Sequence, residues 1–167
     1  LPIIPIRSSQ LTMEIIDLLK DRYWIFGNFA GLGEYILLEC AKKLTYSVIE
    51  YDYKYCSYRL PKKHEELEGT CQCEKTSRGK LVSVFYGKAK SLWFMSHSQK
   101  EKYCKYFPFL RKETTRVLSS VFDKKTLEKI EKLRENIKED IFLIQESNSW
   151  VKGTAESISY AKNKNLK

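Results

Sequence analysis

The fold of this chain is decided by residues 23–60, which read YWIFGNFAGLGEYILLECAKKLTYSVIEYDYKYCSYRL. The apolar run at residues 23–26 is typical of a buried strand, and it stops at Gly27. Gly31 and Gly33 follow in a short turn, where the missing side chains let a ligand approach the backbone closely. These features predict a strand, a glycine turn and a helix at the start of an α/β sheet.

A helix and a second strand are expected after the turn. Apolar residues recur at helical spacing over residues 34–44, with charged residues opposite them. Residues 46–49 are rich in β-branched and aromatic side chains, and Glu50 and Asp52 follow them. The carboxyl ends of parallel strands meet at one edge of a sheet. The acidic end of this second strand should therefore lie beside the glycine turn, where a carboxylate can accept hydrogen bonds from ribose hydroxyls. The segment therefore predicts a site for a nucleoside-containing cofactor.

The same segment resembles the cofactor-binding segment of S-adenosylmethionine-dependent DNA amino-methyltransferases, which modify adenine N6 or cytosine N4. In that family Asp-Pro-Phe-Ala-Gly-Ser-Gly precedes a helix, and Gly-Ile-Glu and a tyrosine follow it. Here the matching order and spacing come from residues 29–33, Ile49-Glu50 and Tyr55. Pro5 and Arg7, before an apolar helix expected at residues 11–19, are similar to the family's preceding motif, which closes over the methionine end of the cofactor. The resemblance implies that S-adenosylmethionine is bound by Pro5, Arg7, Phe29, Ala30, Gly31, Gly33, Glu50 and Tyr55.

Residues 69–95 are expected to form a hairpin, with a turn at residues 76–80 and a strand at residues 81–86. Basic side chains are interleaved there with Phe85, Tyr86 and Trp93, so that cations can contact phosphates while rings stack on bases. A solvated hairpin with its aromatic rings in the core is the alternative. The predicted nucleic-acid contacts are Lys75, Arg78, Lys80, Lys88 and Lys90.

The charge of the chain agrees with a polyanionic partner. Thirty lysines and arginines against twenty-one acids give a formal net charge of +9, which favours DNA, with RNA as a second option. No apolar run approaches the ~18 residues that a membrane span needs, and the first residues lack a signal-peptide pattern. We therefore expect an intracellular protein, in the cytoplasm or nucleus, without a membrane partner.

Five cysteines, an odd count, indicate a reducing compartment and free thiols. Cys56, His64, Cys71 and Cys73 supply four possible zinc ligands within a short span, but their spacing fits none of the usual Cys-x-x-Cys patterns. His64 lies among charged residues and is expected to be exposed. We therefore predict no metal site, with structural zinc at these four residues as the alternative.

The end of the chain would have to supply catalysis. Residues 96–140 have a helical, strongly charged pattern, in which Asp123 can cap a helix with an apolar stripe. Amino-methyltransferases carry an apolar strand followed by Asp/Asn/Ser-Pro-Pro-Tyr/Phe/Trp, which holds the flipped target base. Here the apolar residues 141–144 precede Ser147-Asn148-Ser149-Trp150, so the resemblance implies that Ser147 and Trp150 are catalytic.

Together these patterns predict an α/β fold: a Rossmann-like methyltransferase sheet, complete or incomplete, with an inserted hairpin and helical segment. Residues 1–60 would be the cofactor-binding half, residues 61–140 the insertion for nucleic-acid recognition, and residues 141–167 a degenerate catalytic segment. The first functional hypothesis is methyl transfer to an amino group of a DNA base, by this chain or by a split enzyme whose partner subunit completes the fold. The second is a non-catalytic subunit that binds nucleic acid or a protein partner. The glycine-to-glutamate spacing favours the first, whereas Gly27-Asn28 in place of Asp-Pro and the absence of prolines before Trp150 favour the second.

Overall fold

The computed structural model describes residues 2–111, 115–119, 122–134, 142–148 and 152–165. The chain divides into two compact units, Leu1–Ser120 and Val121–Lys167. Within these residues, every helix is too short or too polar to cross a membrane.

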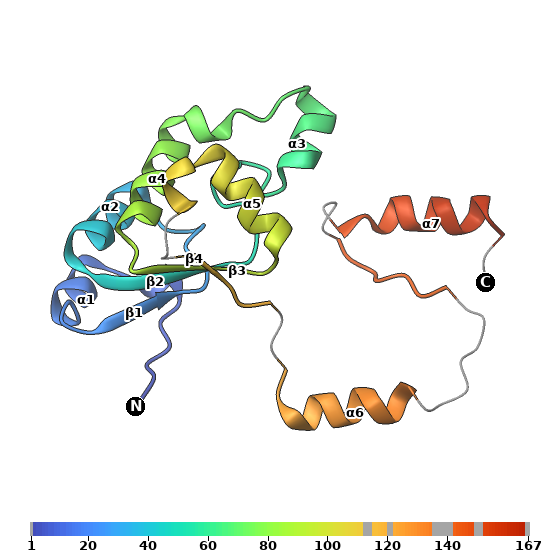
Figure 1. Cartoon of the computed structure of the whole chain (residues 1–167), viewed down its shortest axis with the longest axis horizontal. Coiled ribbons are helices and arrows are strands. Elements are labelled where there is room, and N and C mark those ends of the chain that lie inside the picture. The colour runs from blue at the N-terminus through green and yellow to red at the C-terminus, as the bar shows by residue number, and fades with distance from the viewer. Residues whose placement is uncertain (1, 112–114, 120–121, 135–141, 149–151, 166–167) are drawn as a thin grey trace. The chain divides into compact units, whose positions relative to one another are not determined.

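The first unit is built on a parallel sheet with strand order β1-β2-β3-β4. Its strands are β1 (Tyr23–Phe26), β2 (Thr45–Glu50), β3 (Ser91–Phe94) and β4 (Thr115–Val117). Figure 1 shows the helices α2 (Glu34–Lys43), α4 (Ser77–Lys88) and α5 (His97–Tyr106) packed along this sheet. The unit is therefore an α/β domain with a four-stranded, all-parallel sheet flanked by helices, an arrangement compatible with a Rossmann-like fold.

The strand, helix and strand predicted from residues 23–50 are confirmed as β1, α2 and β2. Phe26 pairs with Val48, so the two strands lie side by side in parallel. Helix α2 buries Leu37, Cys40 and Ala41 against the sheet. Its last turn carries two lysines, which complement the negative end of the helix dipole. The helix ends at Lys43, and its C-cap Leu44 directly precedes β2.

One part of the core lies between the sheet and helix α4. The Tyr46 ring on β2 stacks on Phe85 of α4 with 4.6 Å between ring centres, and its hydroxyl donates to the Phe85 carbonyl oxygen at 2.7 Å. Phe26 meets the same Phe85 ring edge-on. On β1, by contrast, Tyr23 and Ile25 are more than half exposed. Alternate residues of β1 therefore face the helices and the opposite side of the sheet.

The predicted hairpin at residues 69–95 is wrong, because residues 77–88 form helix α4. The apolar run at residues 81–86 reads as a strand, but Val82, Phe85 and Tyr86 have the spacing of one helix face, and all three are buried. The sequence also contains a capping residue at the start of α4. Thr76 is the N-cap, and its Oγ1 accepts a hydrogen bond from the Gly79 amide at 3.1 Å.

Other segments differ from the predicted pattern in smaller ways. Helix α1 (Met13–Leu18) is shorter than the helix expected at residues 11–19. It follows the short turn η1 (Ser8–Gln10) and is capped by Thr12. Residues 51–60, after β2, form turns. The region expected to be helical after residue 96 also contains η3 (Pro108–Arg111) and strand β4. Between β2 and α4 lie α3 (Pro61–Glu68) and η2 (Cys73–Lys75).

The second unit contains α6 (Lys124–Arg134) and α7 (Thr154–Asn163). The predicted cap at Asp123 is confirmed, because its Oδ1 accepts a hydrogen bond from the Thr126 amide at 2.7 Å. The apolar stripe of α6, formed by Leu127, Ile130 and Leu133, is exposed. Residues 142–148 have no strand where the resemblance implied one.

Candidate functional site

The loops after β1 and β2 lie side by side at the carboxyl edge of the sheet. A Cβ atom added to Gly27 would lie 3.6 Å from Cε2 of Tyr51. The Lys54 ammonium lies 5.4 Å from the centre of the Phe29 ring and 6.0 Å from that of Tyr51. The structure therefore brings the glycine turn and the end of the acidic strand together, as their order in the sequence predicts.

The glycine turn leaves open space in front of helix α2. A Cβ atom at Gly33 would meet no atom within 4 Å, and one at Gly31 would meet only Ser8 Oγ, at 3.9 Å. Gly33 is also the N-cap of α2, so the unpaired backbone N–H groups of the first helical turn begin here. Such a helix start suits an anionic group of a ligand. Within the described part of the chain, neither packing nor backbone conformation requires glycine at these two positions.

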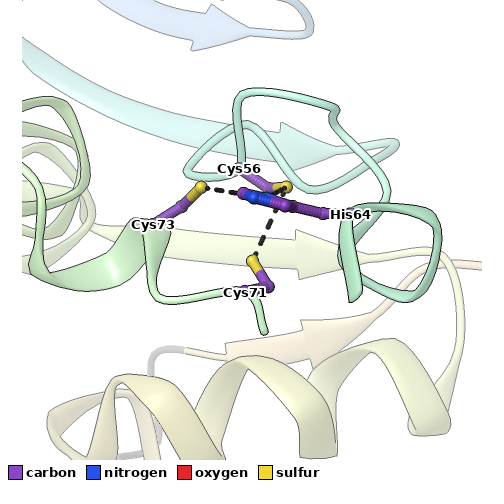
Figure 2. A group of neighbouring side chains, drawn as sticks. All are labelled: Cys56, His64, Cys71 and Cys73. Carbon is purple, nitrogen blue, oxygen red and sulfur yellow. Dashed lines mark hydrogen bonds between the residues drawn. The ribbon is translucent and has the colours of Figure 1, made fainter. Parts of the chain in front are cut away.

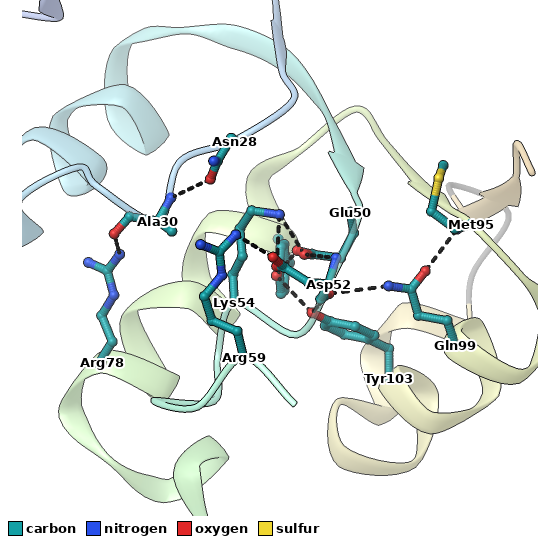
Figure 3. Close-up of polar contacts among 11 residues, drawn as sticks. Asn28, Ala30, Glu50, Asp52, Lys54, Arg59, Arg78, Met95, Gln99 and Tyr103 are labelled. Atoms are coloured by element: carbon teal, nitrogen blue, oxygen red, sulfur yellow. Dashed lines mark hydrogen bonds and ion pairs between the residues drawn. The ribbon is translucent and has the colours of Figure 1, made fainter. Parts of the chain in front are cut away.

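The turn is held in shape by polar contacts, which Figure 3 shows. Asn28 Oδ1 accepts a hydrogen bond from the Ala30 amide at 3.1 Å, a local turn typical of asparagine. The Arg78 guanidinium, at the start of α4, donates to the carbonyl oxygens of Ala30 at 3.4 Å and Leu32 at 3.2 Å. Arg78 therefore fixes the turn to helix α4 and has fewer donors left for a phosphate.

Glu50 is completely buried at the end of β2. Its Oε1 accepts a hydrogen bond from the Lys54 ammonium at 2.7 Å, and its Oε2 accepts one from the Tyr86 hydroxyl. Burial raises the pKa of Glu50 to about 6, although the charge of Lys54 opposes this rise. Both carboxylate oxygens are thus engaged inside the protein. A ribose hydroxyl could reach them only by displacing Lys54 or Tyr86.

Asp52 is the more accessible acid at this strand end, with 29% of its side chain exposed. Its Oδ1 forms an ion pair with the Lys54 ammonium at 3.2 Å, but accepts no hydrogen bond of good geometry among the described residues. Its Oδ2 accepts a hydrogen bond from the half-exposed Arg59. The Asp52 carbonyl oxygen accepts from Tyr103 at 2.9 Å and Gln99 at 3.2 Å (Figure 3). The backbone of Asp52 is therefore fixed by α5, and its side chain is partly exposed although Oδ1 itself is buried.

Tyr55, predicted to lie near an adenine, is instead part of the aromatic core. Only 1% of it is exposed, and its ring packs edge-on against Tyr103 and Phe107. Its hydroxyl has no hydrogen-bond partner among the described residues. Tyr51, by contrast, is 57% exposed beside Gly27. Tyr51 is therefore the aromatic ring of this edge that a ligand can reach.

The buried Glu50 predicts a pH dependence of stability. Its pKa is raised in the folded protein, from an ordinary value of 4.5 to about 6, so the folded state binds more protons than the unfolded state between these values. The free energy of unfolding should therefore be highest, as far as this group is concerned, below pH 4.5 and fall by about 2 kcal/mol as the pH rises through 6. Urea unfolding of the wild type and of Glu50→Gln across this range measures the effect, since the variant lacks the titration. Parallel curves for the two proteins would contradict it.

The residues predicted to contact nucleic acid do not form one surface element. Lys75 and Lys80 are exposed near the start of α4, whereas Lys88 ends that helix and Lys90 follows it. A helix of this length separates its two ends by about 16 Å. Phe85 and Tyr86 are buried, so they are not available for stacking on bases as the hairpin prediction required. What remains is two separate pairs of exposed lysines.

The other predicted site residues lie near the glycine turn, in the second unit or outside the described structure. Pro5 and Arg7 are exposed, next to the η1 turn whose Ser8 approaches Gly31. Phe29 is fully buried under Lys54 and contacts Phe85 and Tyr86. Ser147 belongs to the second unit, where its carbonyl oxygen accepts a hydrogen bond from Thr154. Trp150 lies outside the described residues.

Sequence reasoning missed the residues that support this edge from other elements. Lys54 and Tyr86 hold Glu50, while Gln99 and Tyr103 hold the Asp52 backbone. Only Lys54 carried a signal, as a lysine four residues after the strand's last acid. The others come from α4 and α5, whose packing on the sheet was not predicted.

Comparison with protein-family models, with curated proteins and with solved structures finds no match to this chain. The class of protein is thus defined by the structure itself, as an α/β domain with an all-parallel sheet.

Proposed function

We propose that the Leu1–Ser120 unit binds a nucleoside-containing ligand at the carboxyl ends of β1 and β2, and that this ligand is S-adenosylmethionine. The observation that carries the proposal is the parallel pairing of β1 and β2, which puts the glycine turn and the acids after β2 at one edge. The carboxyl ends of parallel strands are where α/β domains bind such ligands. The resemblance of residues 29–55 to amino-methyltransferases supplies the choice of cofactor.

The accessible groups at this edge have the chemistry that a nucleoside ligand requires. The open space over Gly33 and the first N–H groups of α2 suit the carboxylate of the methionine part. The partly exposed carboxylate of Asp52 can accept hydrogen bonds from ribose hydroxyls. The exposed ring of Tyr51 can pack against the base. In this arrangement Glu50 is a buried support for Lys54 and Asp52, and Asp52 takes the ribose-binding role.

The activity that we propose is transfer of the methyl group to an amino group of a DNA base, by this chain or with a partner subunit. The net positive charge and the exposed lysines near the start of α4 support a polyanionic substrate. The base would have to be held by residues outside the edge described above. Ser147 and Trp150 remain the predicted candidates for that role.

A non-catalytic subunit is the second candidate function, and one observation favours it. The acid that aligns with the family's ribose-binding glutamate, Glu50, has both oxygens engaged inside the protein. A domain that has lost its cofactor could use this carboxylate for stability alone. Such a protein would bind nucleic acid or a protein partner through its basic surface.

Calorimetric titration with S-adenosylmethionine and with its demethylated product tests the proposal. We expect binding by the wild type, and a loss of affinity of about tenfold or more in Asp52→Asn, because the ribose hydroxyls lose a charged acceptor. Asp17→Asn is the matched control, since Asp17 is a half-exposed acid paired with Lys43 on α2. Its affinity should equal that of the wild type.

Gly33→Val gives an independent test of the same site. The added side chain has room in the free protein, so unfolding should change by no more than about 1 kcal/mol, the difference between these residues at an N-cap. The valine would occupy the space proposed for the ligand, so binding should be abolished. Normal binding by Gly33→Val would contradict this location of the site. If neither compound binds the wild type but DNA does, the non-catalytic function holds.

A further inference from the structure

Four side chains between β2 and α4 converge on one buried point. Figure 2 shows Cys56, His64, Cys71 and Cys73, which we call the Cys/His cluster. The three Sγ atoms and a ring nitrogen of His64 all lie within 4.8 Å of one another, and each of the four residues is less than 9% exposed. The expectation that His64 is exposed is therefore wrong.

Three distances within the cluster match those of a tetrahedral metal site. Zinc bonds of about 2.3 Å to sulfur and about 2.05 Å to nitrogen place ligand atoms about 3.8 Å (S to S) and about 3.5 Å (S to N) apart. In the cluster, the Sγ atoms of Cys56 and Cys71 are 3.7 Å apart. His64 Nδ1 lies 3.5 Å from Cys56 Sγ and 3.4 Å from Cys73 Sγ. These three distances are thus those that one shared ion imposes, and all four ligand atoms lie within 4.8 Å of one another.

The surroundings also match those of a metal site. Glu68 Oε2, one turn further along α3, lies 2.8 Å from His64 Nε2 and leaves Nδ1 facing the cysteines. A carboxylate that orients the outer nitrogen of a histidine ligand is a common feature of zinc sites. All four ligands are therefore buried, and His64 is oriented with Nδ1 toward the sulfur atoms.

We propose that the Cys/His cluster binds one zinc ion. Three thiolates and one imidazole are soft and borderline donors, which favour zinc over magnesium or calcium. Four protein ligands complete a tetrahedron and leave no position for water, so the ion has a structural role. The sequence spacing disfavoured a site because only Cys71 and Cys73 are close neighbours. The other two ligands come from the turn after β2 and from helix α3, which the fold brings to them.

A zinc ion would explain how residues 51–76 hold their shape. This segment contains turns, one short helix and a 3-10 turn, and it carries Asp52 and Lys54 of the candidate edge. Binding of the metal would join its beginning, middle and end in one unit. The free energy of metal binding contributes directly to folding, so removal of the ion should destabilise the whole segment.

Metal analysis and cobalt substitution of the full chain test the proposal. We expect one zinc per chain in protein purified without chelators, and cobalt(II) added to the reduced apoprotein should give the strong visible bands of tetrahedral thiolate coordination. Removal of zinc with a chelator should lower the melting temperature by about 10 °C or more. The cobalt spectrum needs no variant, so it remains decisive if substitutions prevent folding.

Cysteine variants complete the test, because the chain contains a matched control. Cys71→Ser and Cys73→Ser should each lower the zinc content and weaken the cobalt charge-transfer band. Cys40→Ser and Cys104→Ser remove equally buried cysteines outside the cluster and should keep the full metal content. The proposal is overturned if reduced wild type binds neither zinc nor cobalt, or if the control variants lose as much metal as the cluster variants. A disulfide between Cys56 and Cys71 in metal-free purified protein would overturn it too.

Discussion

Replacement of Lys54 with methionine is expected to lower the free energy of unfolding by about 3–5 kcal/mol at neutral pH. The Lys54 side chain is fully buried, and its ammonium lies between Glu50 and Asp52, at 2.7 Å and 3.2 Å. Methionine has a similar length but no charge, so Glu50 would remain as a buried carboxylate without its cation. The cost should shrink at low pH, since burial already raises the pKa of Glu50 and the neutral acid needs no cation. Urea unfolding at several pH values measures both effects.

Two further variants separate the loss of a buried partner from the loss of any lysine. Lys42→Met removes a more than half-exposed lysine that pairs with Glu39 at 2.8 Å, and it should cost less than about 1 kcal/mol. The double variant Glu50→Gln/Lys54→Met removes both buried charges and should recover much of the loss, because no unpaired ion remains. Equal costs for Lys54→Met and Lys42→Met would show that the Glu50 pair is not buried as described.

The sequence predicted β1, α2 and β2 because each has a strong local pattern. The apolar run of β1 stops at Gly27, the helical pattern of α2 begins after Gly33, and the β-branched run of β2 ends at Glu50. Neighbouring residues alone therefore decide each element. The pairing of β1 with β2 then follows from the right-handed strand–helix–strand connection. Helix α4 was not predicted, because the apolar run at residues 81–86 fits a strand as well as a buried helix face. Only the Thr76 cap distinguished the two.

The two candidate sites, the edge of the sheet and the Cys/His cluster, could be predicted from the sequence only in part. The edge location followed from the parallel pair, but which acid is accessible did not, because Tyr86 and Lys54 reach Glu50 through packing that local patterns do not encode. The four potential metal ligands of the Cys/His cluster were visible in the sequence, yet their convergence depends on the turns after β2 and on α3. Spacing rules recognise metal sites whose ligands come from one or two short motifs, and this cluster draws on three segments.

Replacement of Gly79 with alanine is expected to lower the free energy of unfolding by about 3 kcal/mol, because the added atom overpacks the interior. Within a helix this substitution normally stabilises, since alanine has the higher helix propensity. At Gly79, however, a Cβ atom would lie 2.0 Å from the carbonyl oxygen of Cys73 and 2.8 Å from backbone atoms of Glu74. The α4 helix and the η2 turn would have to separate. Thermal or urea unfolding measures the loss.

Gly87→Ala is the control within the same helix. Its Cβ would meet only Cε2 of Phe109, at an ordinary 3.6 Å, so this variant should be more stable than the wild type by about 0.5–1 kcal/mol. The same chemical change should therefore alter the free energy of unfolding in opposite directions at the two positions.

Because Cys73 is the residue that Gly79→Ala displaces, the variant should also bind zinc or cobalt at least about tenfold more weakly, which corresponds to 1.4 kcal/mol. Equal stability of the two alanine variants would contradict the close contact of η2 with α4. Loss of stability with unchanged metal affinity would show instead that Cys73 keeps its position when the turn moves.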